Sequence, residues 1–179
     1  MPSSLLTKKR IAKAFKKQLT RQGFDRLSVV DIMQEASLRR QTFYNHFLDK
    51  YELLDWIFET ELQEHITDNL NYISGSQLLE EVLYYLAVNQ DFYVQVLAIR
   101  GQNDFVSYLE RYFQVLVEKI IREYASQKEI AVGEEQLAFS LSYHARAWVA
   151  LVESELQQQP CRLQTLGKLL LALVTKPLI

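Results

Sequence analysis

"SLRRQTFYNHFLDK", residues 37–50, is the most informative stretch of this sequence. Two arginines and several hydrogen-bonding side chains crowd the segment, and Phe43 and Phe47 stand among them four residues apart. On a helix this spacing places both rings on one side, while Gln41 and Asn45 point nearly the opposite way. The segment is therefore predicted to be a short helix, anchored by two rings on one face and polar on the other.

The chain around this segment is predicted to be all-helical. Its 179 residues include only 5 Gly and 3 Pro, while Leu, Gln, Glu and Lys recur at helical periods. Ser28 with Asp31 three residues later predicts a capping box, and Asp49 is expected to cap another helix. We expect about nine helices, near residues 7–22, 29–36, 39–47, 50–73, 77–89, 91–100, 104–126, 134–157 and 162–175.

Charge is distributed unevenly along the chain. Residues 1–50 hold 11 Lys and Arg against 4 Asp and Glu, whereas residues 51–179 hold 9 against 18, for a net charge of -2. A basic block joined to a larger acidic block indicates one part that meets a polyanion and one that does not. We expect two domains, residues 1–50 and 51–179.

The polar face of the 39–47 helix carries side chains suited to nucleic acid. Arginine can form a bidentate pair with guanine, and glutamine or asparagine can do so with adenine. A polar face that merely contacts solvent is the alternative. A lysine-rich helix, a second helix, a short turn and this third helix follow in the order of a helix-turn-helix, which favours DNA binding.

"SVVDIMQEASLRRQTFYNHFLDKYELL", residues 28–54, resembles the DNA-binding signature of the TetR family of bacterial transcription regulators. The resemblance extends over about residues 7–60. It implies a homodimer of all-helical subunits, each with a three-helix amino-terminal DNA-binding domain and a larger carboxy-terminal regulatory and dimerisation domain. The matching positions are Ser28, Asp31-Ile32, Glu35-Ala36, Thr42-Phe43-Tyr44, His46-Phe47, Lys50 and Glu52-Leu53-Leu54.

The resemblance also implies roles for individual residues on double-stranded DNA with a near-palindromic operator. Side chains at four positions would reach into the groove: Arg40, Gln41, Thr42 and Tyr44. Four others would hold the DNA backbone: Ser28, Asn45, His46 and Lys50. Arg39, in the first turn of the helix, is the ninth candidate DNA-binding residue.

Three positions depart from the family pattern. Ser37 stands where the turn commonly has glycine, so a positive φ there would cost about 1 kcal/mol. Arg39 replaces the usual Ser or Thr cap, and Val30 occupies a position that is often basic.

Two apolar seams in the last part of the chain predict a dimer interface. Residues 138, 141, 145, 148 and 152 follow a 3-4-3-4 spacing, and the leucines at 163, 166, 170 and 173 form a second seam. Two such helices could meet their symmetry mates in a four-helix interface, or both seams could pack inside one subunit. The resemblance favours the dimer, with interface residues Leu141, Ala145, Trp148, Val152, Leu166, Leu170 and Leu173.

No other site is assigned from the sequence. The aromatic stretch between residues 72 and 124 could line a ligand pocket with Arg100 or Arg111, or form core, and no ligand-binding residue is named. His65 and His144 lack metal-site spacing and no catalytic motif is present, so we expect no metal, no cofactor and no enzyme activity. A lone Cys161 and the lack of a long apolar run predict a cytoplasmic protein without a membrane span.

"FSLSYHARAWVALVESEL", residues 139–156, is similar to a TetR subgroup that includes activators of dihydroxyacetone kinase operons. That resemblance implies an activator working with a separate co-activator protein that resembles a kinase subunit. One alternative is a TetR-type repressor released by a small molecule bound in its own helical pocket. Another is a helical interaction module whose basic end binds an acidic partner without reading DNA.

Overall fold

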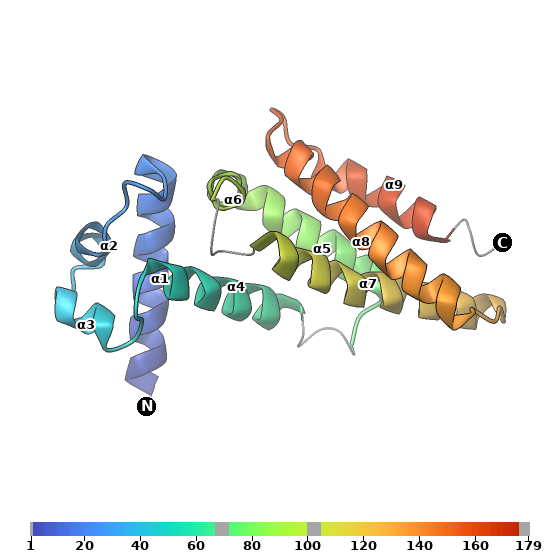
Figure 1. Ribbon diagram of the computed structural model, residues 1–179, viewed down its shortest axis with the longest axis horizontal. Helices are drawn as coiled ribbons and strands as arrows, with labels where there is room; N and C mark the ends of the chain where they lie inside the picture. The colour runs from blue at the N-terminus through green and yellow to red at the C-terminus, as the bar shows by residue number, and fades with distance from the viewer. Residues whose placement is uncertain (1, 67–71, 100–104, 176–179) are drawn as a thin grey trace. The chain divides into compact units, whose positions relative to one another are not determined.

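The computed structural model describes the backbone of residues 2–66, 72–99 and 105–175, and these residues form nine helices with no strand among them (Figure 1). The prediction of an all-helical chain is therefore confirmed. The helices are α1 (Pro2–Gln22), α2 (Val29–Glu35), α3 (Arg40–Tyr44), α4 (Lys50–Ile66), α5 (Gly75–Val88), α6 (Gln90–Leu97), α7 (Phe105–Lys128), α8 (Glu134–Leu156) and α9 (Leu163–Thr175).

Three helix boundaries differ from the predictions by three or more residues. Helix α6 ends at Leu97 rather than near residue 100. Helix α1 begins at Pro2 rather than near residue 7, because proline is well suited to the first position of a helix. Helix α3 ends at Tyr44 rather than Phe47, because the carbonyl of Phe43 accepts from the backbone N–H groups of both His46 and Phe47 at 2.9 Å and the chain turns. The expected end of the fourth helix falls partly on residues 67–71, outside the described residues.

The described residues divide into two compact units. The N-terminal unit comprises those within 1–62 and 91–103, which include α1, α2, α3, most of α4 and most of α6. The C-terminal unit comprises those within 63–90 and 104–179, which include α5, α7, α8 and α9. The functional boundary after residue 50 stays a prediction.

The core of the N-terminal unit forms around the apolar stripe of α1. Ile11, Phe15 and Leu19 are fully buried, as are Ile32 and Met33 of α2. Burying each such side chain contributes about 1.5–3 kcal/mol. The apolar stripe therefore packs the basic helix α1 against the short helix α2.

Local signals set the ends of these helices. Gly23 adopts φ +76° and its N–H donates to the carbonyl of Leu19 at 2.9 Å, which ends α1. The N–H of Asp31 donates to Ser28 Oγ at 3.2 Å while the N–H of Ser28 donates to Asp31 Oδ2 at 3.0 Å, so the capping box is confirmed. Asp49 Oδ1 caps α4 by accepting from the N–H of Glu52 at 2.9 Å.

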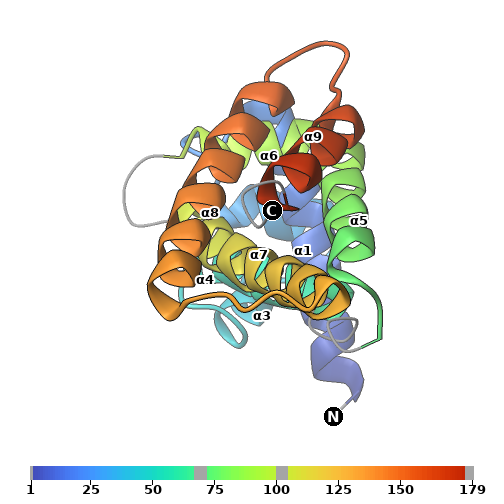
Figure 2. The same ribbon diagram turned by 90° about the vertical axis from the view of Figure 1, so that its right-hand side faces the viewer.

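The C-terminal unit is a bundle of four helices. Helices α7 and α9 each contact both α5 and α8 (Figure 2). The rings of Phe113 on α7 and Trp148 on α8 meet edge to face, with centroids 5.5 Å apart. At Gly75 a Cβ would lie 2.6 Å from Ile120 Cγ1 and 3.1 Å from the Ile120 backbone nitrogen, so glycine allows α5 to approach α7 closely.

None of the helices in the described part of the chain is long and apolar enough to cross a lipid bilayer.

Candidate nucleic-acid interface

Helix α3 is fixed to the N-terminal unit by Phe43, which it contains, and by Phe47 in the turn that follows it. Phe43 is 0% exposed and Phe47 is 2% exposed, and their ring centroids lie 5.6 Å apart. The ring of Phe47 in turn meets that of Trp56 on α4 at 5.8 Å. The predicted anchoring side of this helix is therefore confirmed, and it fixes which side faces outward.

The turn between α2 and α3 is a Schellman motif with serine at its left-handed position. Ser37 adopts φ +53°, its N–H donates to the carbonyl of Gln34 at 3.1 Å, and the N–H of Leu38 donates to the carbonyl of Met33 at 2.9 Å. The two hydrogen bonds satisfy carbonyls at the end of α2. Serine accepts this conformation at a cost of about 1 kcal/mol that glycine would avoid.

The outward side of α3 presents most of the predicted DNA-binding side chains. Arg39 precedes the helix at its N-cap position, where its side chain makes no capping hydrogen bond. Thr42 and His46 are half-buried beside the anchoring rings. Besides Ser28 before α2, the exposed members of the predicted DNA-binding set are Arg39, Arg40, Gln41, Tyr44 and Asn45.

Two predicted backbone-holding residues, Ser28 and Lys50, also make contacts inside the unit. The ammonium of Lys50 donates to the carbonyls of Phe24 at 2.7 Å and Leu27 at 3.1 Å, and lies 4.2 Å from the centroid of the Phe24 ring. Burial lowers the pKa of Lys50 below its ordinary value. Lys50 therefore supports the loop that leads to Ser28 and the start of α2, and one of its three ammonium donors is left over.

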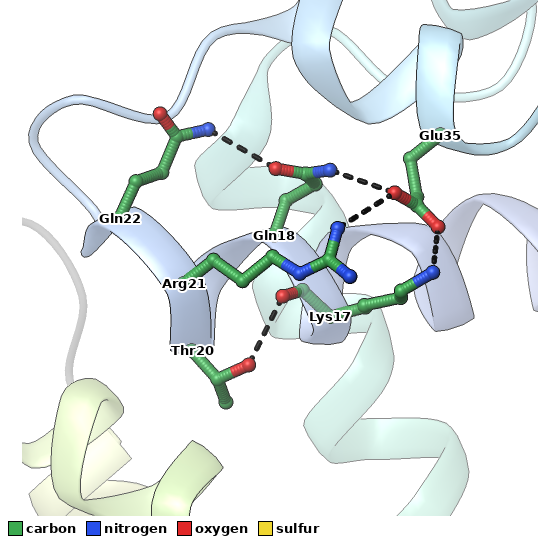
Figure 3. Close-up of polar contacts among 6 residues, drawn as sticks. All are labelled: Lys17, Gln18, Thr20, Arg21, Gln22 and Glu35. Atoms are coloured by element: carbon green, nitrogen blue, oxygen red, sulfur yellow. Dashed lines mark hydrogen bonds and ion pairs between the residues drawn. The ribbon is translucent and has the colours of Figure 1, made fainter.

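An ionic cluster joins α1 to the end of α2 (Figure 3). The carboxylate of Glu35 accepts from the ammonium of Lys17, from the amide of Gln18 at 2.8 Å and from the guanidinium of Arg21 at 3.3 Å. The Lys17 hydrogen bond is the main reason why the pKa of Glu35 lies below its ordinary value. This cluster was not predicted from the sequence, although basic residues four apart on α1 and an acidic residue at the end of α2 were a usable signal.

Several other cations of α1 are held by neighbouring groups. Lys16 forms an ion pair with Glu61 at 2.7 Å and lies 4.8 Å from the centroid of the Phe92 ring of α6. Lys8 lies 5.0 Å from the centroid of the Phe47 ring. These lysines cover apolar surface with their side chains, so the basic charge of α1 does not all point into open solvent.

The predicted dimer residues divide into a buried group and an accessible group. Ala145, Trp148 and Val152 of α8 and Leu170 of α9 are at most 2% exposed within a single subunit, so that part of the predicted seams packs internally. Leu141 and Leu166 are half-buried, and Leu173 is 53% exposed. The 3-4-3-4 spacing located an apolar face of each helix but did not say whether the same subunit or a partner covers it.

A second apolar face of α8 and α9 is exposed. The rings of Phe139 and Tyr143 stack on each other with centroids 5.9 Å apart, on the side of α8 opposite to Trp148. Leu169 of α9 extends the exposed part of the leucine seam. The exposed large apolar side chains of these two helices are Phe139, Tyr143, Leu151, Leu169 and Leu173.

Four of the ten aromatic residues in the stretch between 72 and 124 lie in the core, whereas Tyr72 and Tyr84 are exposed. Phe92, Tyr93, Phe105 and Phe113 are buried, and Arg111 is exposed, while Arg100 lies outside the described residues. The C-terminal unit has an open groove of ≈ 620 Å³ between α5 and α9, lined in part by Glu80, Tyr84 and Lys168. No cluster of three or more His, Cys, Asp or Glu suited to a metal ion occurs among the described residues.

Comparison with known proteins agrees with this architecture. Residues 11–57 match the model of the bacterial regulatory proteins of the tetR family, and residues 74–159 match that of a transcriptional regulator C-terminal region. An HTH-type dhaKLM operon transcriptional activator, DhaS of Lactococcus lactis subsp. lactis (strain IL1403), is 35% identical over 156 residues, which are 87% of this chain and 82% of the relative.

Solved structures have the same fold. A dihydroxyacetone kinase operon activator DhaS superimposes with a TM-score of 0.86 at 32% identity, covering 97% of both chains. A TetR transcriptional regulator from Streptococcus agalactiae 2603V superimposes with a TM-score of 0.65 at 20% identity, covering 97% of this chain and 96% of the other. These relatives are transcription regulators rather than enzymes, and this chain belongs to the TetR family of bacterial transcription regulators.

Proposed function

We propose that two copies of this chain place their α3 helices in successive major grooves of a near-palindromic operator, about 34 Å apart. The observation that carries the proposal is the two-sided character of α3, whose inner face is fixed by the buried rings of Phe43 and Phe47. Its outer face exposes Arg40, Gln41 and Tyr44. A short helix that is held by the core on one face and is polar on the other is suited to contact base edges in the major groove.

The side chains of this interface would divide their work. Arg40, Gln41 and Thr42 would reach base edges in the major groove, and Tyr44 would reach into the groove beside them. The remaining candidates would hold phosphates on either side: Ser28, Arg39, Asn45, His46 and Lys50. Residues 1–50 would then be the DNA-binding domain and residues 51–179 the regulatory and dimerisation domain.

Homodimerisation would use the exposed apolar face of α8 and α9. Exposed stacked rings and leucines are costly in water, and a second copy would cover them across a two-fold axis. Leu166 and Leu173 of the predicted seams lie at or beside this face. Leu141 lies on the Trp148 side of α8, and Trp148 and its buried neighbours would support the face from behind.

We infer from the 35% identity to the dhaKLM operon activator that the regulator activates a dihydroxyacetone kinase operon. A protein co-activator resembling a dihydroxyacetone kinase subunit would dock on the C-terminal unit and control it, in the cytoplasm. In vitro transcription from the operon promoter should rise when regulator and co-activator are both added. A fall in transcription on adding the regulator alone would favour a repressor instead.

One observation supports that second candidate, a repressor released by a small molecule. The hydroxyl of Tyr112 on α7 is buried without a hydrogen-bond partner among the described residues, and burial raises its pKa above the ordinary value. A polar ligand group in the interior of the C-terminal unit would satisfy that hydroxyl.

Selection of bound duplexes from a random pool tests the DNA-reading proposal. The recovered sites should share an inverted repeat with half-site centres about 10–10.5 base pairs apart. Recovery of unrelated duplexes without a common repeat would instead support the interaction module without specific DNA reading.

A further inference from the structure

Arg40 and Tyr44 form a pair that spans α3 from its first residue to its last. The Nη2 of Arg40 donates a hydrogen bond to Tyr44 Oη at 3.2 Å, and the guanidinium carbon lies 5.6 Å from the centroid of the tyrosine ring. Both side chains are exposed. The arginine is thus held by a hydrogen bond and by a cation–π contact on the outward side of the helix.

The tyrosine is itself fixed from below. The ring of Tyr44 meets the fully buried ring of Phe43 edge to face, with centroids 5.5 Å apart. Because Phe43 is part of the core, the position of Tyr44 is tied to the core of the N-terminal unit. A contact with Tyr44 therefore gives the long side chain of Arg40 a preferred direction.

The pairing leaves Arg40 able to bind a further acceptor. A guanidinium has five N–H donors, and bidentate recognition of guanine O6 and N7 uses two of them. Among the described residues no carboxylate forms an ion pair with Arg40. The pair thus holds the guanidinium in place without neutralising its charge.

We propose that Tyr44 is a positioning residue that orients Arg40 to read one guanine in each half of the operator. The inference rests on the proposed function, because it assigns a base and a division of labour within the same helix. Tyr44 acts through Arg40: it reduces the rotamer freedom that arginine would lose on binding, and so favours the geometry of the bidentate pair.

A merely structural role for the pair has a different signature. Side chains four residues apart stabilise a helix, so loss of the contact could weaken α3 as a whole. That would lower affinity for every duplex and the unfolding midpoint together. Positioning of Arg40 instead predicts an effect confined to one G·C pair per half-site.

The test compares the full-length dimers of the wild type, Arg40→Ala, Tyr44→Phe and the double variant. The affinity of each protein is measured for the selected operator and for a set of duplexes in which each base pair is replaced in turn. All measurements use one salt concentration. Arg40→Ala should lose discrimination at one G·C pair by about 5- to 150-fold. Tyr44→Phe should lose about 2- to 12-fold at the same pair, and nothing further in the Arg40→Ala background.

A modified base provides a second measurement, in which the DNA is changed instead of Tyr44. Replacing that guanine with 7-deazaguanine removes the N7 acceptor, so wild-type binding should weaken while binding by Arg40→Ala should hardly change. Tyr51→Phe is the matched control, since it removes a hydroxyl from a tyrosine of α4 whose ring packs against Phe24, and its base profile should equal that of the wild type.

The outcomes separate the two levels of the proposal. An effect of Tyr44→Phe at a different base pair, an equal loss on all duplexes, or an Arg40→Ala profile without any guanine effect would each overturn the positioning role while leaving DNA reading intact. If the wild type prefers no duplex over random DNA, the proposed function itself fails and the inference fails with it.

Discussion

Ser37 shows at the scale of one residue how the turn before α3 is built. Its φ of +53° lies in the left-handed region, and the two Schellman hydrogen bonds keep it there. The sequence comparison with the family pattern located this position correctly, because glycine commonly stands there. The helix-turn-helix geometry is therefore maintained despite a residue that fits it less well.

Ser37→Gly should raise the free energy of unfolding by about 1 kcal/mol, because glycine adopts a positive φ without steric cost. The urea midpoint should rise with an unchanged slope. Ser37→Ala is the control, since it keeps the Cβ and should bring no gain. A glycine variant no more stable than the alanine variant would show that Ser37 is unstrained.

Glu35 should make the free energy of unfolding of the N-terminal unit depend on pH. Its pKa is lowered in the folded state, chiefly by Lys17, so the unfolded chain binds a proton more readily than the folded one. Its stabilising contribution is thus complete above the ordinary value near 4.5 and is lost as pH falls through the lowered folded pKa.

Urea unfolding of the wild type and of Glu35→Gln at several pH values should show this loss of stability. The wild type should be the more stable protein at neutral pH, and the difference between the two midpoints should shrink as pH falls below about 4.5. A constant difference over that range would mean that the charge of Glu35 is not what joins α1 to α2.

Close helix packing at the scale of elements depends on particular glycines. Gly75 lies against both the side chain and the backbone of Ile120, whereas a Cβ at Gly167 would meet only Leu83 Cδ1 at 2.7 Å. A backbone cannot move aside without moving its helix, but the end of a leucine side chain can. The two glycines should therefore tolerate alanine differently.

Gly75→Ala should lower the free energy of unfolding by about 1–3 kcal/mol through forced separation of α5 from α7. Gly167→Ala should change it little, because the better helix propensity of alanine offsets the shift of Leu83. Thermal and urea unfolding of both variants would measure this. Equal losses in the two variants would contradict the distinction between backbone and side-chain contacts.

The elements themselves could largely be predicted from the sequence. Helical periodicity, Ser28, Asp49 and Gly23 gave most helix positions because capping and amphipathicity are local properties. The extent of α3 could not be predicted, because no capping residue in the sequence marks the turn in which the Phe43 carbonyl accepts from two backbone N–H groups. The pairing of Lys50 with the carbonyls of Phe24 and Leu27 was equally inaccessible, since it joins residues 26 and 23 positions apart.

At the scale of the whole molecule, the sequence predicted apolar seams on α8 and α9. It did not say whether the same subunit or a partner subunit covers each seam. Trp148 and Val152 lie in the core of the subunit. Phe139, Tyr143 and Leu169 form the exposed face that we propose as the contact with the partner subunit. Both faces have apolar side chains at helical spacing, so only the folded subunit distinguishes them.

Leu169→Glu should convert the dimer into monomers at micromolar concentration, because a charge would be buried against the partner subunit. Sedimentation velocity measures the change, and circular dichroism should show that the helices persist. Val88→Glu on α5, which likewise replaces an exposed apolar residue, should stay dimeric. A dimeric Leu169→Glu variant would place the interface elsewhere.

The central claim, that the outer face of α3 reads DNA sequence, is tested most directly by competition between the selected operator and a scrambled duplex of equal length and at fixed salt. The wild type should prefer the operator by about 10³-fold or more. Gln41→Ala should lose about 5- to 150-fold of that preference while keeping its affinity for the scrambled duplex. Equal binding of both duplexes by the wild type would contradict the account.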